Sequence, residues 1–154
     1  MTKIDQIDRN VLEKLQRNAK ITNAQLSKEI GLSPAPTLER VKKLEQSGII
    51  KSYHAKLEPA KVGLNVTTFV QVSLIGHRKS VTESFVEKIN DIPEIIECHH
   101  ITGTADFLLK VISEDISTYQ KLMLEKINEI EEVSNTQSMV ILSTFKDSKV
   151  LPIP

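Results

Sequence analysis

The sequence predicts an α+β protein with a helical N-terminal part and a C-terminal part of βαββαβ order. Apolar residues recur at helical spacing up to about residue 47, whereas from residue 66 onward β-branched runs typical of strands alternate with helical patterns. The 154 residues are 40% hydrophobic and 26% charged, an ordinary composition for one medium domain or two small ones. The change of pattern favours two small domains.

The first two helices are predicted from their apolar spacing and their caps. In IDQIDRNVLEKLQRN, Asp5 is a plausible N-cap, and one apolar stripe carries Ile7, Val11, Leu12 and Leu15. In ITNAQLSKEIG, Thr22 and Gln25 have capping-box spacing and Gly31 ends the helix. Both helices are short and amphipathic.

The third helix, in LSPAPTLERVKKLEQSGII, is predicted over residues 34–47. Ser33 has the position of an N-cap, and Pro34 and Pro36 fit the first turn, where amide hydrogens lack a carbonyl partner. Gly48 suits the left-handed residue that closes a helix. Two helices joined by so short a turn with a glycine are typical of a helix-turn-helix, whose second helix lies in the DNA major groove.

The outer side of this third helix holds the candidate DNA contacts. On a helical wheel, Leu38, Val41 and Leu44 share one side, which we expect to face the core. The basic side chains of the other side suit phosphates or guanine edges, and a glutamate there can accept from cytosine N4. The alternative is a solvated helix whose basic residues pair with Glu39 or Glu45. The DNA-binding candidates are Ser33, Ala35, Pro36, Glu39, Arg40, Lys42 and Lys43.

Charge and cysteine content agree with a nucleic-acid-binding first half. Residues 1–58 hold 11 basic and 7 acidic residues, a net +4, and residues 59–154 hold 9 and 13, a net −4. Neither a signal-peptide h-region nor an apolar run near a membrane span occurs. Because Cys98 is the single cysteine, an intramolecular disulfide is excluded. We expect a soluble, cytoplasmic protein.

The remaining elements define the domain organisation. The stretch IIKSYHAKLEP alternates enough to predict short strands of a small wing, so residues 1–58 are predicted as a winged helix-turn-helix domain. A hinge is expected at residues 59–65, and a ferredoxin-like βαββαβ domain at residues 66–154. Its expected elements are a strand at 66–75, a helix opened by a Ser80–Glu83 capping box, strands at 95–101 and 107–112 around a turn at 103–106, a helix capped by Asp115, and a strand at 133–145.

Two motifs in the second half contain residues that could bind a metal or a small ligand. The motif ECHH, Glu97 to His100, contains residue types that bind zinc. On a strand, however, Cys98 and His100 would face one way and His99 the other, and the sequence contains no second ligand pair. In TGTADF, a turn at Gly103 leaves backbone amides open, and Asp106 offers a carboxylate to an ammonium group, which suits an amino acid. The alternative is a hairpin turn in which Asp106 makes local hydrogen bonds.

The motifs together resemble the Lrp/AsnC family, the leucine-responsive or feast/famine transcription factors, over essentially the whole chain. The stretches that carry the resemblance are IDRNVLEKLQRN, LSKEIGLSPAPTLERVKKLEQSGII, YHAKLEP, IIECHH, and the G-x-x-D-F-L-L-K run from Gly103 to Lys110. The resemblance implies a winged helix-turn-helix, a hinge strand and a ligand-binding domain often called RAM. It also implies dimers that commonly assemble into octameric discs around which DNA can wrap.

The resemblance further implies an amino acid effector bound between dimers, near the Gly-x-x-Asp turn and the last strand. The corresponding positions here are Gly103, Thr104, Ala105, Asp106, Thr136 and Ser138. An aromatic residue is usual directly before the aspartate, so Ala105 implies a pocket that is wider, altered in specificity or unused.

The sequence therefore predicts a sequence-specific DNA-binding transcriptional regulator that forms homodimers or octamers, senses an amino acid, and needs no metal or other cofactor. One rival function is an amino-acid sensor without its own DNA target, which would not need the basic two-helix half. A second rival, an enzyme, is disfavoured because no GxSxG, GxGxxG or P-loop motif occurs.

Overall fold

The structure, a computed structural model, describes residues 4–154 and contains two compact units. The helical unit consists of residues 4–56 together with residues 145–154, and the sheet unit consists of residues 57–144. The sequence assigned residues 145–154 to the second domain, whereas their contacts lie with the helical unit. The chain therefore passes between the two units twice.

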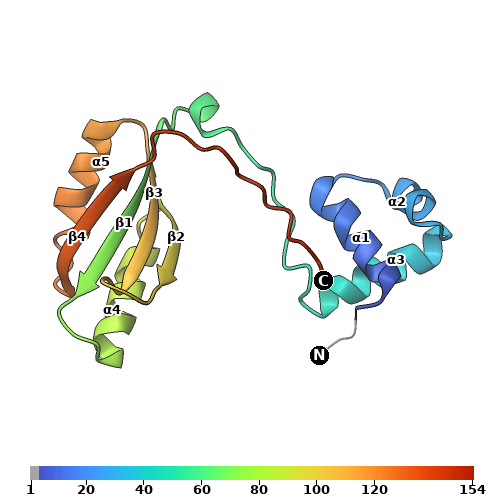
Figure 1. Cartoon of the computed structure of the whole chain (residues 1–154), viewed down its shortest axis with the longest axis horizontal. Helices are drawn as coiled ribbons and strands as arrows, with labels where there is room; N and C mark the ends of the chain where they lie inside the picture. The colour runs from blue at the N-terminus through green and yellow to red at the C-terminus, as the bar shows by residue number, and fades with distance from the viewer. Residues whose placement is uncertain (1–3) are drawn as a thin grey trace. The chain divides into compact units, whose positions relative to one another are not determined.

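The helical unit contains three helices (Figure 1). Side-chain caps set the start of the first two, and prolines set the start of the third. The helices are α1 (Gln6–Arg17), α2 (Asn23–Ile30) and α3 (Pro34–Gln46). The Asp5 carboxylate accepts from the Asp8 amide at 2.8 Å and Asp8 reciprocates, while the Thr22 hydroxyl accepts from the Gln25 amide at 3.2 Å. Gly31 closes α2 with a φ of +72°, as expected. Ser33 is the N-cap of α3, but its hydroxyl makes no capping bond, so the prolines set this start.

The core of the helical unit differs from the predicted apolar stripes. Its fully buried apolar residues are Val11, Leu12, Leu26 and Leu44. The expectation that Leu38 faces inward is wrong, because 43% of its surface is exposed. Thr37 takes the inner position at 0% exposure, and its hydroxyl donates to the Ser33 carbonyl at 2.9 Å. Thr37 is almost two full turns before Leu44 and so lies on the same side of the helix, whereas Leu38 is about 100° further round.

The short strands expected after α3 are not formed. Residues 51–58 are extended but belong to no strand. A strand needs a hydrogen-bonded neighbour, and the described chain supplies none to this alternating stretch. The prediction of strands in this wing segment was therefore wrong.

The sheet unit has the predicted βαββαβ order and a ferredoxin-like topology (Figure 1). A 3-10 turn (Pro59–Val62) precedes its elements: β1 (Val66–Leu74), α4 (Lys79–Asn90), β2 (Ile95–His100), β3 (Phe107–Ser113), α5 (Ile116–Leu122), a π-helical turn η2 (Met123–Ile127) and β4 (Val133–Val140). The strands form one antiparallel sheet in the order β2-β3-β1-β4. The α+β fold class is thus confirmed.

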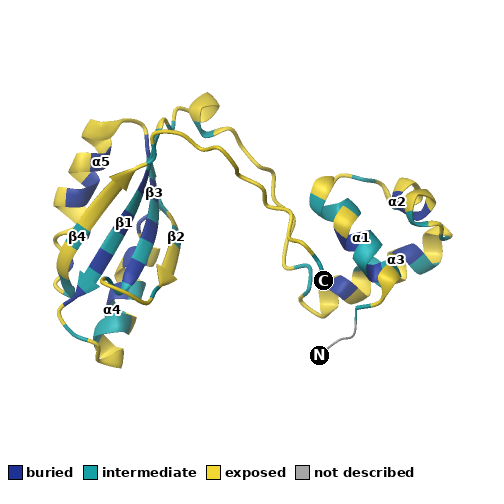
Figure 2. Ribbon diagram, viewed as in Figure 1, coloured by how far each residue is buried: buried dark blue, intermediate teal, exposed yellow. Residues whose placement is uncertain are grey.

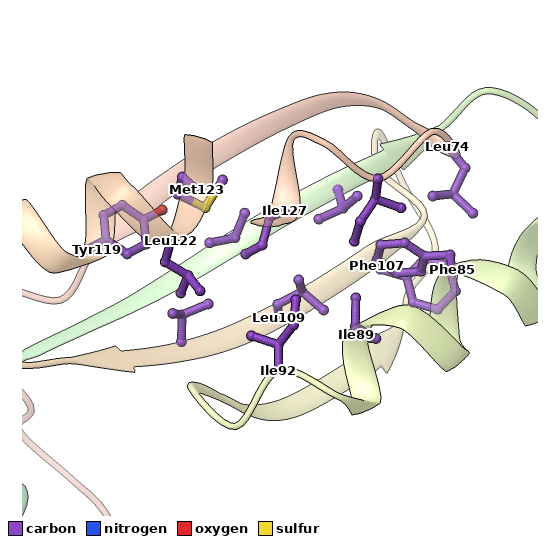
Figure 3. Packing of buried hydrophobic residues seen from close by; sticks show 14 residues of the cluster. Leu74, Phe85, Ile89, Ile92, Phe107, Leu109, Tyr119, Leu122, Met123 and Ile127 are labelled. Atoms are coloured by element: carbon purple, nitrogen blue, oxygen red, sulfur yellow. The ribbon is translucent and has the colours of Figure 1, made fainter. Parts of the chain in front are cut away.

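Helices α4 and α5 cover one face of this sheet and leave the other face bare. Alternate residues of β1 and β3 point into the core, visible as dark stripes in Figure 2. Phe85 of α4 packs on Phe107 of β3 with ring centroids 4.9 Å apart (Figure 3). On the opposite face, Phe69, Leu108 and Met139 are only partly covered.

Two element boundaries differ from the sequence prediction. The Ser80 capping box is wrong, because α4 begins at Lys79 with Arg78 as its N-cap residue. Strand β4 ends at Val140 rather than at residue 145, since Thr68 pairs with Val140 and the Ile141 amide donates to the Thr67 carbonyl near the start of β1. No partner strand remains for the residues beyond.

Candidate DNA-binding helix and ligand-binding turn

The outward face of α3 presents most of the predicted DNA contacts to solvent. Ser33, Ala35, Glu39, Lys42 and Lys43 are exposed, whereas Pro36 and Arg40 are half-buried. The Asn23 side-chain amide donates to the Pro34 carbonyl at 2.8 Å, which ties the start of α2 to the start of α3. The short turn is therefore held at a fixed angle by a polar contact as well as by the apolar core.

The side chains of Glu39, Lys42 and Lys43 make no hydrogen bond or ion pair with any other described residue. The alternative of a self-paired helix surface is not what the structure shows. Glu45 is occupied differently, accepting from the Tyr53 hydroxyl at 2.9 Å. Burial and this carboxylate raise the pKa of Tyr53 to about 12. Two lysines of α3 are thus available to an external anion.

Arg40 has a different environment from its lysine neighbours. One guanidinium nitrogen lies 2.7 Å from both the Asp5 and the Asp8 carboxylates. The Asp8 side chain is only 9% exposed, so this pair is shielded from solvent on one side. The hydrogen bonds that Arg40 donates to Asp5 and Asp8 raise the pKa of its guanidinium group. The structure places Arg40 as a link between α3 and the N-terminus of α1.

The turn between β2 and β3 has the open backbone that the sequence suggested. Gly103 has a φ of +126°, a conformation that favours glycine, and Thr104 beside it is exposed. Within the described chain, the backbone amides of residues 102–105 donate no hydrogen bond. Ala105 is half-buried and leaves no aromatic wall. These free amides could receive a carboxylate.

Asp106 fastens this turn to the end of β1. Its amide donates to the Val72 carbonyl at 3.0 Å, and its Oδ2 accepts from the Leu74 amide at 2.8 Å. Local hydrogen bonding, one of the two interpretations of this residue, is therefore observed. The other oxygen, Oδ1, faces the exposed His77 ring at 3.2 Å from Nδ1. Asp106 thus uses one oxygen for the backbone and the other for His77, and nothing in the sequence pattern identified His77.

Thr136 and Ser138 lie on the helix-facing side of β4, with their hydroxyls already engaged. Thr136 donates to Asn128 Oδ1 at 3.2 Å, and Ser138 shares a short hydrogen bond with the Tyr119 hydroxyl. Burial raises the pKa of Tyr119, although Ser138 partly opposes this. The sequence identified Tyr119 only as a core residue and missed its polar role.

The turn and the β4 hydroxyls do not meet within one chain. Val72 of β1 pairs with Phe107 on one side and with Thr136 on the other. Two strand spacings of about 4.8 Å therefore separate residue 107 from Thr136, about 10 Å in all. The two halves of the predicted effector site flank β1 at the same level of the sheet.

The ECHH motif forms polar and ring contacts on the sheet. Glu97 accepts from Lys110 at 3.0 Å and lies 3.3 Å from His99, while His100 stacks on Phe107 at 5.0 Å between centroids. The described residues hold no cluster of three or more metal-ligating side chains. None of the helices in residues 4–154 is long and apolar enough to cross a membrane.

Comparison with known proteins agrees with both units. The model of a winged helix-turn-helix DNA-binding domain matches residues 4–51, and that of the Lrp/AsnC ligand binding domain matches residues 67–151. The chain is 39% identical to the leucine-responsive regulatory proteins of Klebsiella pneumoniae and Escherichia coli over 150 residues, which is 97% of this chain and 92% of each relative. Both relatives are named as regulatory proteins.

Solved structures give the same result. A transcriptional regulator from Neisseria meningitidis in complex with L-methionine superposes with a TM-score of 0.93 at 33% identity, covering 97% of both chains. AsnC of Escherichia coli has a TM-score of 0.87 at 30% identity, covering 97% of this chain and 99% of its own. The chain therefore belongs to the Lrp/AsnC family of transcriptional regulators, with a helix-turn-helix DNA-binding domain and a ligand-binding domain.

Proposed function

We propose that the protein binds specific operators in the cytoplasm through the outward face of α3 and that an amino acid modulates this binding. One observation carries the DNA contact: Lys42 and Lys43 are exposed and have no partner among the described residues. Unpaired cations on a helix that follows a short turn suit phosphates and guanine edges. In this proposal Ser33, Ala35, Pro36 and Glu39 approach the bases or backbone, while Arg40 positions α3.

The DNA-binding form is proposed to be a homodimer that assembles further into an octamer, as the family resemblance implies. The bare face of the sheet supports a second copy as its cover. Phe69 lies between Met139 and Lys110 in the register, and Leu108 and Ile112 extend the partly exposed apolar surface. Burying such a surface favours association.

The effector is proposed to be an amino acid held near the Gly103–Asp106 turn. Free amides of this turn suit its carboxylate, and Asp106 Oδ1 suits its ammonium group. Thr136 and Ser138 would contribute from the last strand of a neighbouring dimer, because they lie apart from the turn within one chain. Methionine is the first candidate, since a similar regulator binds L-methionine and Ala105 leaves room for a long side chain.

The rival function, amino-acid sensing without a DNA target, gives no role to the unpaired lysines of α3. A selection from random duplex DNA decides between the two, carried out with and without methionine, leucine, arginine, lysine and glutamine. Enrichment of one sequence motif whose affinity changes with an amino acid is the expected result. Recovery of unenriched DNA in every selection would contradict specific DNA binding, and an enriched motif indifferent to all amino acids would contradict effector control.

A further inference from the structure

The C-terminal tail, defined as residues 147–154, runs along the helical unit and is gripped by one side chain of α1. The Leu151 amide donates to Gln16 Oε1 at 2.6 Å, and Gln16 Nε2 donates to the Leu151 carbonyl at 3.3 Å. A single side-chain amide thus satisfies both polar groups of one tail residue, as a neighbouring strand would. A side-chain amide that pairs in this way with the backbone of one residue can recognise an extended peptide.

The tail lies along an apolar groove of the helical unit. The open space that remains in this groove is about 360 Å³, and it is lined both by Leu151 and Ile153 of the tail and by apolar residues of the helical unit, among them Ile4, Leu12 and Ile50. Ile153 of the tail packs against the buried core cluster of the unit. Pro152 and Pro154 flank Ile153 and carry no amide hydrogen, so the peptide needs few further acceptors in the groove. A Leu-Pro-Ile-Pro sequence fits this site chemically.

A second contact holds the other end of the tail. Lys56 Nζ lies 2.8 Å from the Asp147 carboxylate and donates to the Asp147 carbonyl at 3.0 Å. In Figure 1 the last residues of the chain run beside the segment that follows α3. The tail therefore makes polar contacts at both ends, with Lys56 and with Gln16.

These contacts are too exposed to hold the tail permanently. The Lys56 and Asp147 side chains are 62% and 45% exposed, and an ion pair so open to solvent contributes little. Leu151 itself is 71% exposed. Covalent attachment compensates, because the tail is linked to the helical unit through the sheet unit, which keeps its effective concentration above that of a separate peptide.

We propose that this groove is a peptide-binding site of the DNA-binding unit whose occupant is the chain's own C-terminal tail, docked reversibly. Gln16 recognises the backbone of Leu151, and Ile153 is the apolar anchor. None of the exposed DNA-binding candidates of α3 lines the groove, so docking leaves that face open. The docked tail gives the helical unit a second attachment to the last strand of the sheet unit, one that can open and close.

Cross-linking of the full chain tests which tail occupies the groove. In a Cys98→Ser background, Gln16→Cys and Leu151→Cys are combined and treated with a short bismaleimide. Own-tail docking gives a cross-linked product of single-chain mass. A matched pair, Gln6→Cys with Leu151→Cys, uses the same helix away from the groove and should react far less. Products of double mass would assign the groove to a second copy, and equal reaction of both pairs would mean that no site exists; either result overturns the proposal.

Binding in trans tests the recognition itself. A chain ending at Thr144 should bind a labelled peptide of residues 146–154, measured by fluorescence anisotropy, with a dissociation constant of about 0.1–1 mM, below or near the effective concentration in cis. Gln16→Ala should weaken this binding about five- to tenfold, because two hydrogen bonds are lost. Gln6→Ala should leave it unchanged. Absence of binding, or equal binding by the Gln16 variant, would refute the site.

Discussion

Arg40 and Lys43 are basic residues of the same helix with different surroundings. Arg40 is held between two carboxylates of α1, whereas Lys43 is exposed and unpaired within the described chain. Sequence alone placed both on the DNA-binding face. The three-dimensional contacts instead separate a residue that positions the helix from one that can meet a phosphate.

The two alanine variants should therefore affect different measurements. Lys43→Ala should lower the slope of log affinity against log salt by about one for each protomer bound, because one phosphate contact is lost, without changing stability. Arg40→Ala should reduce the unfolding free energy by about 1–2 kcal/mol, since it leaves the Asp8 carboxylate nearly buried without its cation. Salt titrations of DNA binding and urea unfolding measure the two effects. A stability loss in the lysine variant, matched by none in the arginine variant, would reverse the assignment.

Two substitutions of Asp106 distinguish its structural role from its proposed role in effector binding. Asp106→Asn keeps an oxygen that can accept from the Leu74 amide but removes the charge, so the fold should persist. Loss of a charge-assisted hydrogen bond to the ammonium group should weaken amino-acid binding tenfold or more. Asp106→Ala removes both functions and should also lower stability by about 1 kcal/mol. Calorimetric titration with methionine checks this, and unchanged affinity in the asparagine variant would exclude Asp106 from the effector site.

At the scale of elements, Glu132 joins α4 to the segment that enters β4. Its carboxylate accepts from Lys88 Nζ at 2.7 Å and from the Ser84 hydroxyl at 2.6 Å, and its carbonyl accepts from the Ile75 amide at 2.9 Å. The Lys88 ammonium, and then the Ser84 hydroxyl, lower the pKa of Glu132 to about 2. One residue thus links three elements at one end of the sheet unit.

This low pKa predicts a defined acid dependence of stability. A carboxyl group that titrates at about 2 when folded and near 4.5 when unfolded stabilises the fold fully above pH 4.5. That contribution is lost as the pH falls toward 2. Glu132→Gln should lower the melting temperature at pH 7, and the difference from wild type should disappear between pH 4.5 and 2. Glu131→Gln, at the adjacent position, is the control, and a difference that persists at pH 2 would contradict the assignment.

The ends of helices and strands could be predicted where residues close in the sequence determine them. They could not be predicted where contacts with distant residues determine them. The Asp5, Thr22 and Asp115 caps are confirmed because a side chain and an amide three residues away suffice. Ser80 failed because helix bonding already begins at the Arg78 carbonyl. The alternating stretch at residues 51–58 could not become a strand without a partner, which no local pattern reveals.

Only part of the geometry of the candidate ligand-binding site could be predicted from the sequence. The open turn at Gly103 follows from its own backbone. The hydroxyls of Thr136 and Ser138, by contrast, point to Asn128 and Tyr119, because sheet register decides which face a β4 residue occupies. The sequence pattern also contained no signal for the tail that docks on Gln16, since that contact joins residues 135 positions apart.

At the scale of the whole molecule, two-fold association should determine the shape of the operator. If two copies pair through the bare sheet face, two α3 helices should require a roughly palindromic site with half-sites about one helical turn apart. Footprinting with sedimentation analysis of the same complex measures this. A footprint much longer than two half-sites would indicate wrapping around a larger assembly, and full affinity of a monomer for an asymmetric site would contradict the dimer.

The chain passes from the helical unit to the sheet unit and back, so a single cut in its backbone leaves the C-terminal tail and the three helices on different fragments. A protease that nicks the exposed hinge near Lys61 would leave the tail on the larger C-terminal fragment, yet that tail is docked on the smaller N-terminal one. Because the proposed dissociation constant of the tail is about 0.1–1 mM, the two fragments should separate in gel filtration at micromolar concentration, whereas the uncut chain keeps its tail docked. A single cut in the hinge should therefore release the helical unit from the sheet unit, because among the described residues the docked tail is the one remaining link between the two fragments, and it is not covalent.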